Sequence, residues 1–518
     1  MASLSLSVTL SASTRSRSKK KTKETKEINI CDLERRETSV FCYCNNIQPR
    51  NATDANCWIF DRFEVDNPIW GHFTSQLYLE KLTFTVRQDG SITYVPTAVL
   101  KQLKNLHSVT FQYASIPELA ERSFSNLSSI SEINLSRNMI VVLRKFAFEN
   151  MKNLTMVNLD ENRIVEVNRD VFVGLPKLTK LSFNRNNIST LHDKAFKHLS
   201  TLLELELNGN QIAVITRDSF HGLRNLQKLD LRNNLLSMIG DRSFIEMPEL
   251  RELELDQNKI EFISEDALEG MRNLKKLRLS ENKLVSLEPD FLAGAPGVSF
   301  LNLRDNALRT MTFDNVKPIV TNLYNSNSYF YLDGNKLICD CKLAWIWGLR
   351  NETKNKKLRD TLEELTCFLE SNNASLRSSQ EAGNDQPLGA ADRAEEYQAE
   401  KPRGGNEEDA YMGDGGEYYE YEEEYEDAAS NSNALPKVEV VEGKVGYVRH
   451  LFDLKPEELP CPEPSREDLM ASEQPSSHRD RARAGSSGSI FSLSSAEALI
   501  GSRSTLGLLQ LLVVAIFT

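Results

Sequence analysis

The chain of 518 residues has little of what an enzyme or a membrane-spanning protein requires. It has seven histidines, none paired with a serine or cysteine in a recognisable nucleophile motif. It has no phosphate loop, dinucleotide fingerprint or HExxH motif. Its apolar run at 506–517 is shorter than the roughly twenty residues that cross a bilayer. We therefore expect no catalytic residue, no metal ligand and no cofactor.

A basic surface is also missing. The formal net charge is −12, and the stretch 407–427 holds eleven acidic and no basic residues. Without that stretch the charge is close to balanced, so no footprint for nucleic acid stands out and none is expected as a partner. The composition of the acidic stretch predicts a disordered insertion at about 370–440.

Cysteine is absent from the middle of the chain. Four cysteines precede residue 58 and four follow residue 338, at Cys31, Cys42, Cys44, Cys57, Cys339, Cys341, Cys367 and Cys461. An even number clustered at two ends predicts disulfide-stapled caps in an oxidising compartment. Each group of four allows three pairings. A zinc site at Cys339-Asp340-Cys341 is disfavoured because it lacks the usual spacing of ligand pairs.

Between the cysteines, two columns of residues repeat at intervals of 24. The first is Asn138, Asn162, Asn186, Asn210, Asn234, Asn258, Asn282 and Asn306. The second is Phe124, Phe148, Phe172, Phe196, Phe220 and Phe244, continued by Leu268 and Leu292. Apolar residues lie eight, five and three positions before each Asn and two after it, which is the extracellular type of leucine-rich repeat. We expect an α/β, right-handed solenoid with a curved parallel sheet and capped ends, whose Leu, Phe and Asn columns are core.

The residues left to recognise a partner are therefore those at the outward positions of the concave sheet. One column alternates in sign, so an antiparallel second copy could match Lys to Glu, as an isologous contact requires. An ordinary mixed-charge surface alternates as well, and the sequence leaves both interpretations open. The candidate binding face is Lys180, Glu204, Glu206, Lys228, Asp230, Glu252, Glu254, Lys276 and Arg278.

Two kinds of modification are expected. Seven Asn-x-Ser/Thr triplets predict glycosylation at Asn51, Asn126, Asn134, Asn153, Asn187, Asn351 and Asn373. Five tyrosines stand in the acidic run, at Tyr411, Tyr418, Tyr419, Tyr421 and Tyr425. They are either sulfated and bind a basic partner, or part of a solvated spacer. Asn134 points outward from the sheet, so a glycan there would obstruct part of the concave face.

The two ends of the sequence bear on export and anchoring. The short apolar run 4–10 precedes a basic cluster, which reverses the order of a signal peptide. Either the true start is missing or export depends on a poor signal; a cytosolic protein with a basic tail would leave the cysteine caps unexplained. Small residues from Ser494, a spacer at 497–505 and the apolar run 506–517 have the layout of a glycosylphosphatidylinositol signal. We expect attachment at Ser494, with Ser486 or Ser487 as alternatives; an incidental apolar tail is the other interpretation.

The cysteine clusters resemble the flanking modules of extracellular leucine-rich-repeat proteins. That resemblance implies Cys31–Cys44 with Cys42–Cys57, and Cys339–Cys367 with Cys341–Cys461. The segments Ile30-Cys31-Asp32-Leu33 and Phe41-Cys42-Tyr43-Cys44-Asn45, the acidic tyrosine-rich insertion and the lipid-anchor tail resemble the connectin family of insect adhesion proteins, over roughly residues 28–518.

The connectin resemblance implies homophilic contact between cells, including neurons and muscles during target recognition. It places the protein on the extracellular face of the plasma membrane, held by a lipid anchor. The alternative is a lipid-anchored co-receptor that binds a secreted or membrane protein. The expected domains are a basic segment with a defective signal region (1–27), a cysteine-rich cap (28–75), the repeats (76–337), a second cap with the insertion (338–461), a flexible stalk (462–494) and an anchor propeptide (495–518).

Overall fold

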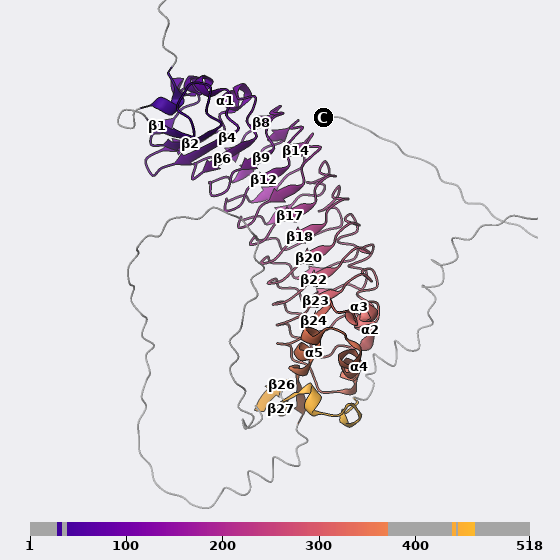
Figure 1. Ribbon diagram of the computed structural model, residues 1–518. Helices are drawn as coiled ribbons and strands as arrows, with labels where there is room; N and C mark the ends of the chain where they lie inside the picture. The colour runs from indigo at the N-terminus through magenta and orange to yellow at the C-terminus, as the bar shows by residue number, and fades with distance from the viewer. Residues whose placement is uncertain (1–27, 34–38, 371–437, 442–443, 462–518) are drawn as a thin grey trace, which may run out of the picture. The chain divides into compact units, whose positions relative to one another are not determined.

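The computed structural model describes residues 28–33, 39–370, 438–441 and 444–461. The expected signal region, acidic tyrosines, stalk and anchor site lie outside these residues. Within them, the main element is one sheet of 13 strands whose members follow one another in chain order (Figure 1). It begins with β1 (Val40–Cys44), antiparallel to β2 (Asp54–Ile59), and every later pair in it is parallel.

Each turn of the chain adds one strand to this sheet. After β2 come β4 (Lys81–Val86), β6 (Ser108–Gln112), β9 (Glu132–Asn134), β12 (Met156–Asn158), β15 (Lys180–Ser182), β17 (Glu204–Glu206), β18 (Lys228–Asp230), β20 (Glu252–Glu254), β22 (Lys276–Arg278), β23 (Phe300–Asn302) and β24 (Tyr329–Tyr331). From β9 to β23, residues 24 apart are direct partners, as Glu204 is with Lys228. This register confirms the predicted leucine-rich-repeat solenoid.

The alternation of side chains along each short strand separates core from surface. In β15, β17 and β18 the central Leu181, Leu205 and Leu229 are fully buried, while the first residue of each strand is partly exposed. A turn cannot bury its own apolar side, so stability comes from stacking on its neighbours.

The Asn column links successive turns through otherwise unpaired backbone groups. The Nδ2 of Asn210 donates to the carbonyl oxygens of Phe183 and Leu207 at 3.0 and 2.9 Å. Its Oδ1 accepts the backbone N–H of Ile188 at 3.0 Å. Because all these groups are buried, each Asn satisfies three backbone groups that water cannot reach.

The Phe column fills the side of the solenoid opposite the sheet. Phe124, Phe148 and Phe172 stack with ring centroids 5.3 and 5.1 Å apart. Short parallel strands accompany the turns away from the main sheet: β7 (Glu118–Leu119) with β10 (Val142–Leu143), β8 (Phe124–Ser125) with β11 (Phe148–Glu149) and β14 (Phe172–Val173), β13 (Glu166–Val167) with β16 (Thr190–Leu191), and β19 (Met238–Ile239) with β21 (Phe262–Ile263).

The last turn is longer than the rest. The Asn column passes from Asn306 to Asn335, and this longer turn contains α2 (Phe313–Val316) and α3 (Val320–Leu323). Asn335 then accepts the N–H of Leu308 at 3.0 Å, as earlier Asn residues do for their turns. The sheet therefore continues into β24 despite the irregular spacing.

The amino-terminal cap closes the first strands. It contains η1 (Ile30–Asp32), η2 (Pro68–Gln76), α1 (Thr97–Gln102) and the pair β3 (Arg62–Phe63) and β5 (Ser91–Ile92). Trp70 packs against Phe84 at 5.9 Å and donates from Nε1 to the Tyr94 hydroxyl at 2.7 Å. Disulfides join Cys31 to Cys44 and Cys42 to Cys57.

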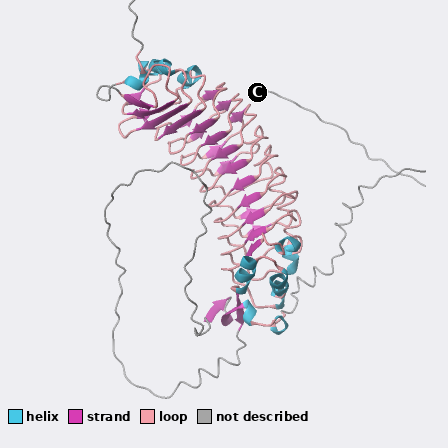
Figure 2. Ribbon diagram, viewed as in Figure 1, coloured by secondary structure: helices cyan, strands magenta, loops and turns pink. Residues whose placement is uncertain are grey.

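The second cap covers β24. It contains η3 (Cys341–Leu343), α4 (Trp345–Glu352), α5 (Lys356–Glu363), η4 (Leu451–Asp453), η5 (Pro456–Glu458) and an antiparallel sheet of β25 (Thr366–Glu370), β27 (Lys444–His450) and β26 (Val438–Val441). In the described residues the helices lie towards the two ends of the row of strands (Figure 2). Disulfides join Cys339 to Cys367 and Cys341 to Cys461, so Cys339 and Cys341 are not zinc ligands.

Candidate binding face

The outward side chains of β12 to β24 form one continuous surface, which we call the sheet face. The nine residues predicted from the sequence as a binding face all lie on it, at the first and third positions of β15 to β22. The in-register stacking places equivalent residues of adjacent turns about 4.8 Å apart. Charges of opposite sign on neighbouring turns are therefore within reach of each other.

The lysines of the sheet face are already paired within the chain. The ammonium of Lys180 lies 3.2 Å from Glu204 and 2.8 Å from Glu206. Lys276 lies 3.3 Å from Glu252. Lys228 lies 3.6 Å from Glu254, the residue two positions after Glu252. Pairing between adjacent turns therefore accounts for the alternation of sign without a second copy of the chain.

A buried network occupies the middle of the sheet face. Arg232 contacts Asp230 at 2.7 Å and Glu254 at 3.0 Å. Only 4% of Asp230 and 7% of Glu254 is exposed, so both carboxylates lie beneath the surface. Burial raises the pKa of Glu254, although the charge of Arg232 opposes that shift. The hydrogen bond to Asp230 raises the pKa of Arg232, which is therefore a permanent cation that holds two acids together.

A second polar network precedes the first. The Ser182 hydroxyl lies 2.6 Å from Asp160 and 2.9 Å from Glu206, and Asn184 donates to Glu206 at 2.9 Å. Burial raises the pKa of Asp160. Burial also acts to raise the pKa of Glu206, but Lys180 outweighs it and the pKa lies below the ordinary value. These side chains are engaged with each other and stabilise the sheet.

A third group of polar side chains, around Asp256, lies one turn after Arg232. Asp256 accepts from the N–H and the hydroxyl of Ser280 at 2.8 and 2.6 Å. Burial raises the pKa of the Asp256 carboxyl despite those hydrogen bonds and the charges of Arg278 and Arg232. Many of the predicted acidic and basic residues of the middle turns thus have partners within the chain, and their role as a binding face stays a prediction.

The aromatic end of the sheet face was not predicted. The rings of Phe300, Tyr329 and Tyr331 lie 5.7 to 6.2 Å apart. The guanidinium of Arg278 covers the Phe300 ring at 5.0 Å, and that of Arg304 covers Tyr331 at 4.5 Å. All five side chains are partly exposed. We call these five residues the end cluster.

A fixed 24-residue period could not find Tyr329 and Tyr331 of the end cluster, because β24 follows a longer turn. The alternation Tyr329-Phe330-Tyr331-Leu332 was the available signal. Phe330 and Leu332 are buried, while the two tyrosines face outward. Among the predicted residues, only Arg278 belongs to the cluster.

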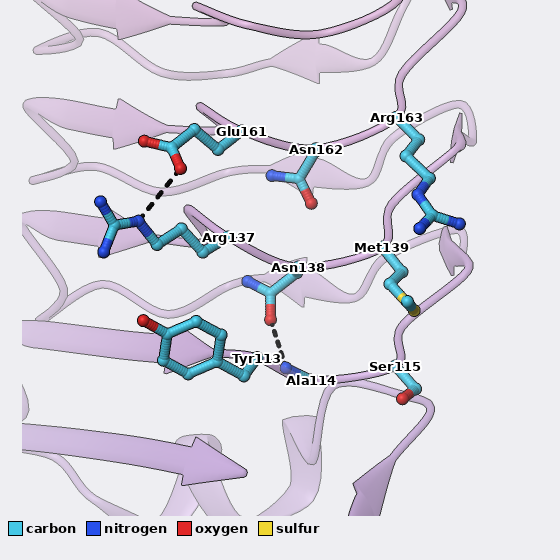
Figure 3. A pocket seen from close by; sticks show the side chains of 9 residues that line it. All are labelled: Tyr113, Ala114, Ser115, Arg137, Asn138, Met139, Glu161, Asn162 and Arg163. Carbon is cyan, nitrogen blue, oxygen red and sulfur yellow. Dashed lines mark hydrogen bonds and ion pairs between the residues drawn. The ribbon is translucent and has the colours of Figure 1, made fainter. Parts of the chain in front are cut away.

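A hollow of about 570 Å³ lies at the edge of the sheet near its amino-terminal end. Figure 3 shows Tyr113, Arg137 and Glu161 on one side of it and Met139 and Arg163 on the other. Asn138 and Asn162 lie between these two sides, and their amides are engaged with the backbone. The two amides at the floor of the hollow are therefore already bonded within the chain.

The predicted glycosylation sites are distributed unevenly. Asn51, Asn126, Asn153, Asn187 and Asn351 are exposed, Asn134 is partly exposed on β9, and Asn373 lies outside the described residues. No Asn-x-Ser/Thr triplet begins between residues 188 and 350. Residues 188–350 therefore offer no glycan attachment site, while the next one, Asn351, lies on α4 of the second cap.

No helix within the described ranges is long and apolar enough to cross a membrane. Ser494, Ser486, Ser487 and the five acidic-run tyrosines lie outside those ranges. Anchoring and sulfation therefore remain predictions from the sequence.

Comparison with known proteins agrees with this architecture. The leucine-rich-repeat family model matches residues 130–188, 176–236, 224–284 and 248–308. Connectin from Drosophila melanogaster is 54% identical over 341 residues, which cover 65% of this chain and 50% of the relative. The chain thus spans about half the length of the curated relative that it matches.

Two solved structures match part of the chain. The crystal structure of the TLR13–ssRNA13 complex matches with 22% identity and a TM-score of 0.46, over 54% of this chain and 41% of the other. The Toll–Spatzle complex of Drosophila matches with 20% identity and a TM-score of 0.44, over 59% of this chain and 44% of the other. The protein is a leucine-rich-repeat solenoid with connectin-like sequence.

Proposed function

We propose that this protein is a cell-surface adhesion and recognition molecule that binds a second copy of itself on an apposed cell. The main support for the proposal is the 54% identity with Connectin. The aligned stretch is too long for this identity to come from the shared repeat signature alone. The connectin resemblance implies homophilic contact between cells, and neuron and muscle target recognition is its proposed setting.

The fold suits a binding role. The Leu, Phe and Asn columns are buried and hold the turns together, so they are unavailable to a partner. The partly exposed residues of the sheet face lie outside these columns and are accessible to a partner. Four disulfides in the caps suit an oxidising compartment, which supports an extracellular location.

A lipid-anchored co-receptor for a secreted or membrane protein is the second candidate. Two observations favour it: the acidic, tyrosine-rich run 407–427, and the lysines of the sheet face, which already have acidic partners in their own chain. Capture of a basic ligand through sulfated tyrosines would not involve the sheet face at all.

Mixing two differently labelled populations of non-adherent cells that express the full chain separates the two candidates. Homophilic adhesion predicts mixed aggregates in which both labels occur, formed without any other cell type. Cells that express the protein on their surface and stay single would contradict homophilic adhesion and favour the co-receptor.

The anchor has its own test. Phosphatidylinositol-specific phospholipase should release the protein from the cell surface if the tail that begins after Ser494 is replaced by a glycolipid. Retention of the protein after treatment would contradict the anchor but would leave the adhesion proposal intact.

A further inference from the structure

The end cluster is the part of the sheet face with the composition of a protein interface. Interface centres are enriched in Tyr, Phe and Arg and depleted in Lys, Glu and Asp. The middle turns carry Lys, Glu and Asp, whereas β23, β24 and the adjoining turns carry Phe300, Tyr329, Tyr331, Arg278 and Arg304. Aromatic and arginine anchors supply most of the binding energy where they occur together.

The rings of the end cluster are held in place before any partner arrives. Arg304 donates to Asp333 at 2.7 Å while its guanidinium covers Tyr331. Arg278 lies over Phe300, which touches both tyrosines. Because these side chains are already ordered, they lose little rotamer entropy on binding. Burial raises the pKa of Tyr331, so its hydroxyl is a neutral donor at physiological pH.

Carboxylates of the same chain lie beside the two arginines of the end cluster, which reduces repulsion between two identical surfaces. Arg304 is paired with Asp333, and Lys276 beside the cluster is paired with Glu252. The charge of Arg278 opposes the rise in pKa that burial causes at Glu254 and Asp256. A surface of one sign would repel its own copy, whereas this one presents arginines, carboxylates and aromatic rings together.

The rest of the sheet face is less suited to such a contact. Beside its amino-terminal end, on the neighbouring strand β9, Asn134 is a predicted glycan site. In the middle, Asp230, Glu254 and Asp256 are buried and offer little contact area. The end cluster lies among turns that carry no glycan attachment site, near α5 of the second cap (Figure 1).

We infer that two copies of the chain meet through the end cluster, with Tyr329, Tyr331 and Phe300 of one copy against the same residues of the other. The inference rests on the proposed homophilic adhesion and names the residues that perform it. The contact is isologous, so each copy contributes both arginine-covered rings and carboxylates.

The test uses the full chain displayed on non-adherent cells. The variant Tyr329→Ser with Tyr331→Ser should lower the fraction of aggregated cells on the order of tenfold at equal surface level, as loss of a hot spot does. The control changes two exposed residues at the opposite end of the repeats, Tyr113→Ser with Arg137→Ala, and should aggregate like the parent.

A second variant guards against misfolding of the first. Arg278→Asn creates the triplet Asn-Leu-Ser, which reproduces the arrangement of Asn134-Leu135-Ser136 on a turn of the end cluster. Its glycosylated form, identified by a glycosidase-sensitive shift in mass, should block aggregation.

The outcomes distinguish the inference from the function on which it rests. If the parent chain aggregates cells and both variants do so equally well at equal surface level, the contact lies elsewhere and the inference is wrong, while homophilic adhesion stands. If the parent chain fails to aggregate cells, homophilic adhesion fails and the inference falls with it.

Discussion

The middle and the carboxyl-terminal end of the sheet face use their outward residues in opposite ways. In the middle, Arg232 joins Asp230 and Glu254, and all three are engaged with each other. At the end, Arg304 also has a carboxylate partner in Asp333 but lies over a partly exposed ring. A regular pattern of charged residues can therefore stabilise the fold through ion pairs within the chain. In the proposed contact, the partner binds residues outside that pattern.

Removal of the central arginine should have the largest effect on stability. Arg232→Ala leaves Asp230 and Glu254 buried without their shared cation, at a cost of about 3–5 kcal/mol. Arg304→Ala removes a pair in which both side chains are about 40% exposed, so about 1 kcal/mol or less is expected. Urea unfolding of the two secreted variants measures the contrast. Equal losses would remove the proposed distinction between the two regions.

A smaller effect should appear as a dependence on pH. Burial raises the pKa of Asp256, so this carboxyl stabilises the fold fully below the ordinary aspartate pKa and loses that contribution as pH rises through its folded value. Asp256→Asn cannot ionise and keeps an acceptor for Ser280. The variant should therefore gain stability relative to the parent between pH 4 and pH 7.

Unfolding midpoints at several pH values measure this difference. Ser280→Ala serves as the control, because it removes one hydrogen bond but leaves the ionisable carboxyl in place. A parent and an Asp256→Asn variant whose stabilities differ by a constant amount at every pH would contradict the assigned pKa shift.

The smallest effect should come from an exposed pair. Arg137 and Glu161 lie 3.1 Å apart with more than a third of each side chain exposed. Arg137→Ala should change the free energy of unfolding by about 0.5 kcal/mol or less, and high salt should abolish the difference. A loss of stability as large as that of Arg232→Ala would mean that solvent exposure does not distinguish a weak ion pair from a strong one.

The sequence alone was enough to predict the solenoid, because each buried column repeats at a constant interval. The Leu, Phe and Asn positions of β9 to β23 follow directly from that interval. The same regularity left the choice of binding residues open, since alternating Lys and Glu are compatible with a partner's surface and with internal pairs. Only the distances between charged atoms on adjacent turns show that these residues form pairs within the chain, as Lys180 does.

The two tyrosines of the end cluster could not be predicted from the 24-residue period, and the reason is physical. The turn that contains α2 and α3 shifts Tyr329 and Tyr331 out of phase with the earlier columns. Their position beside Phe300 depends on how the long turn folds back to resume the Asn column at Asn335. How the long turn folds back depends on tertiary packing, which the 24-residue interval does not specify.

Sorting of mixed cells tests the central claim most directly. Cells that display the parent chain are mixed with differently labelled cells that display Tyr329→Ser with Tyr331→Ser at equal surface level. An isologous contact through the end cluster predicts aggregates of parent cells from which the variant cells are excluded, while cells with Tyr113→Ser and Arg137→Ala join freely. Variant cells that enter the aggregates as readily as the control would contradict it.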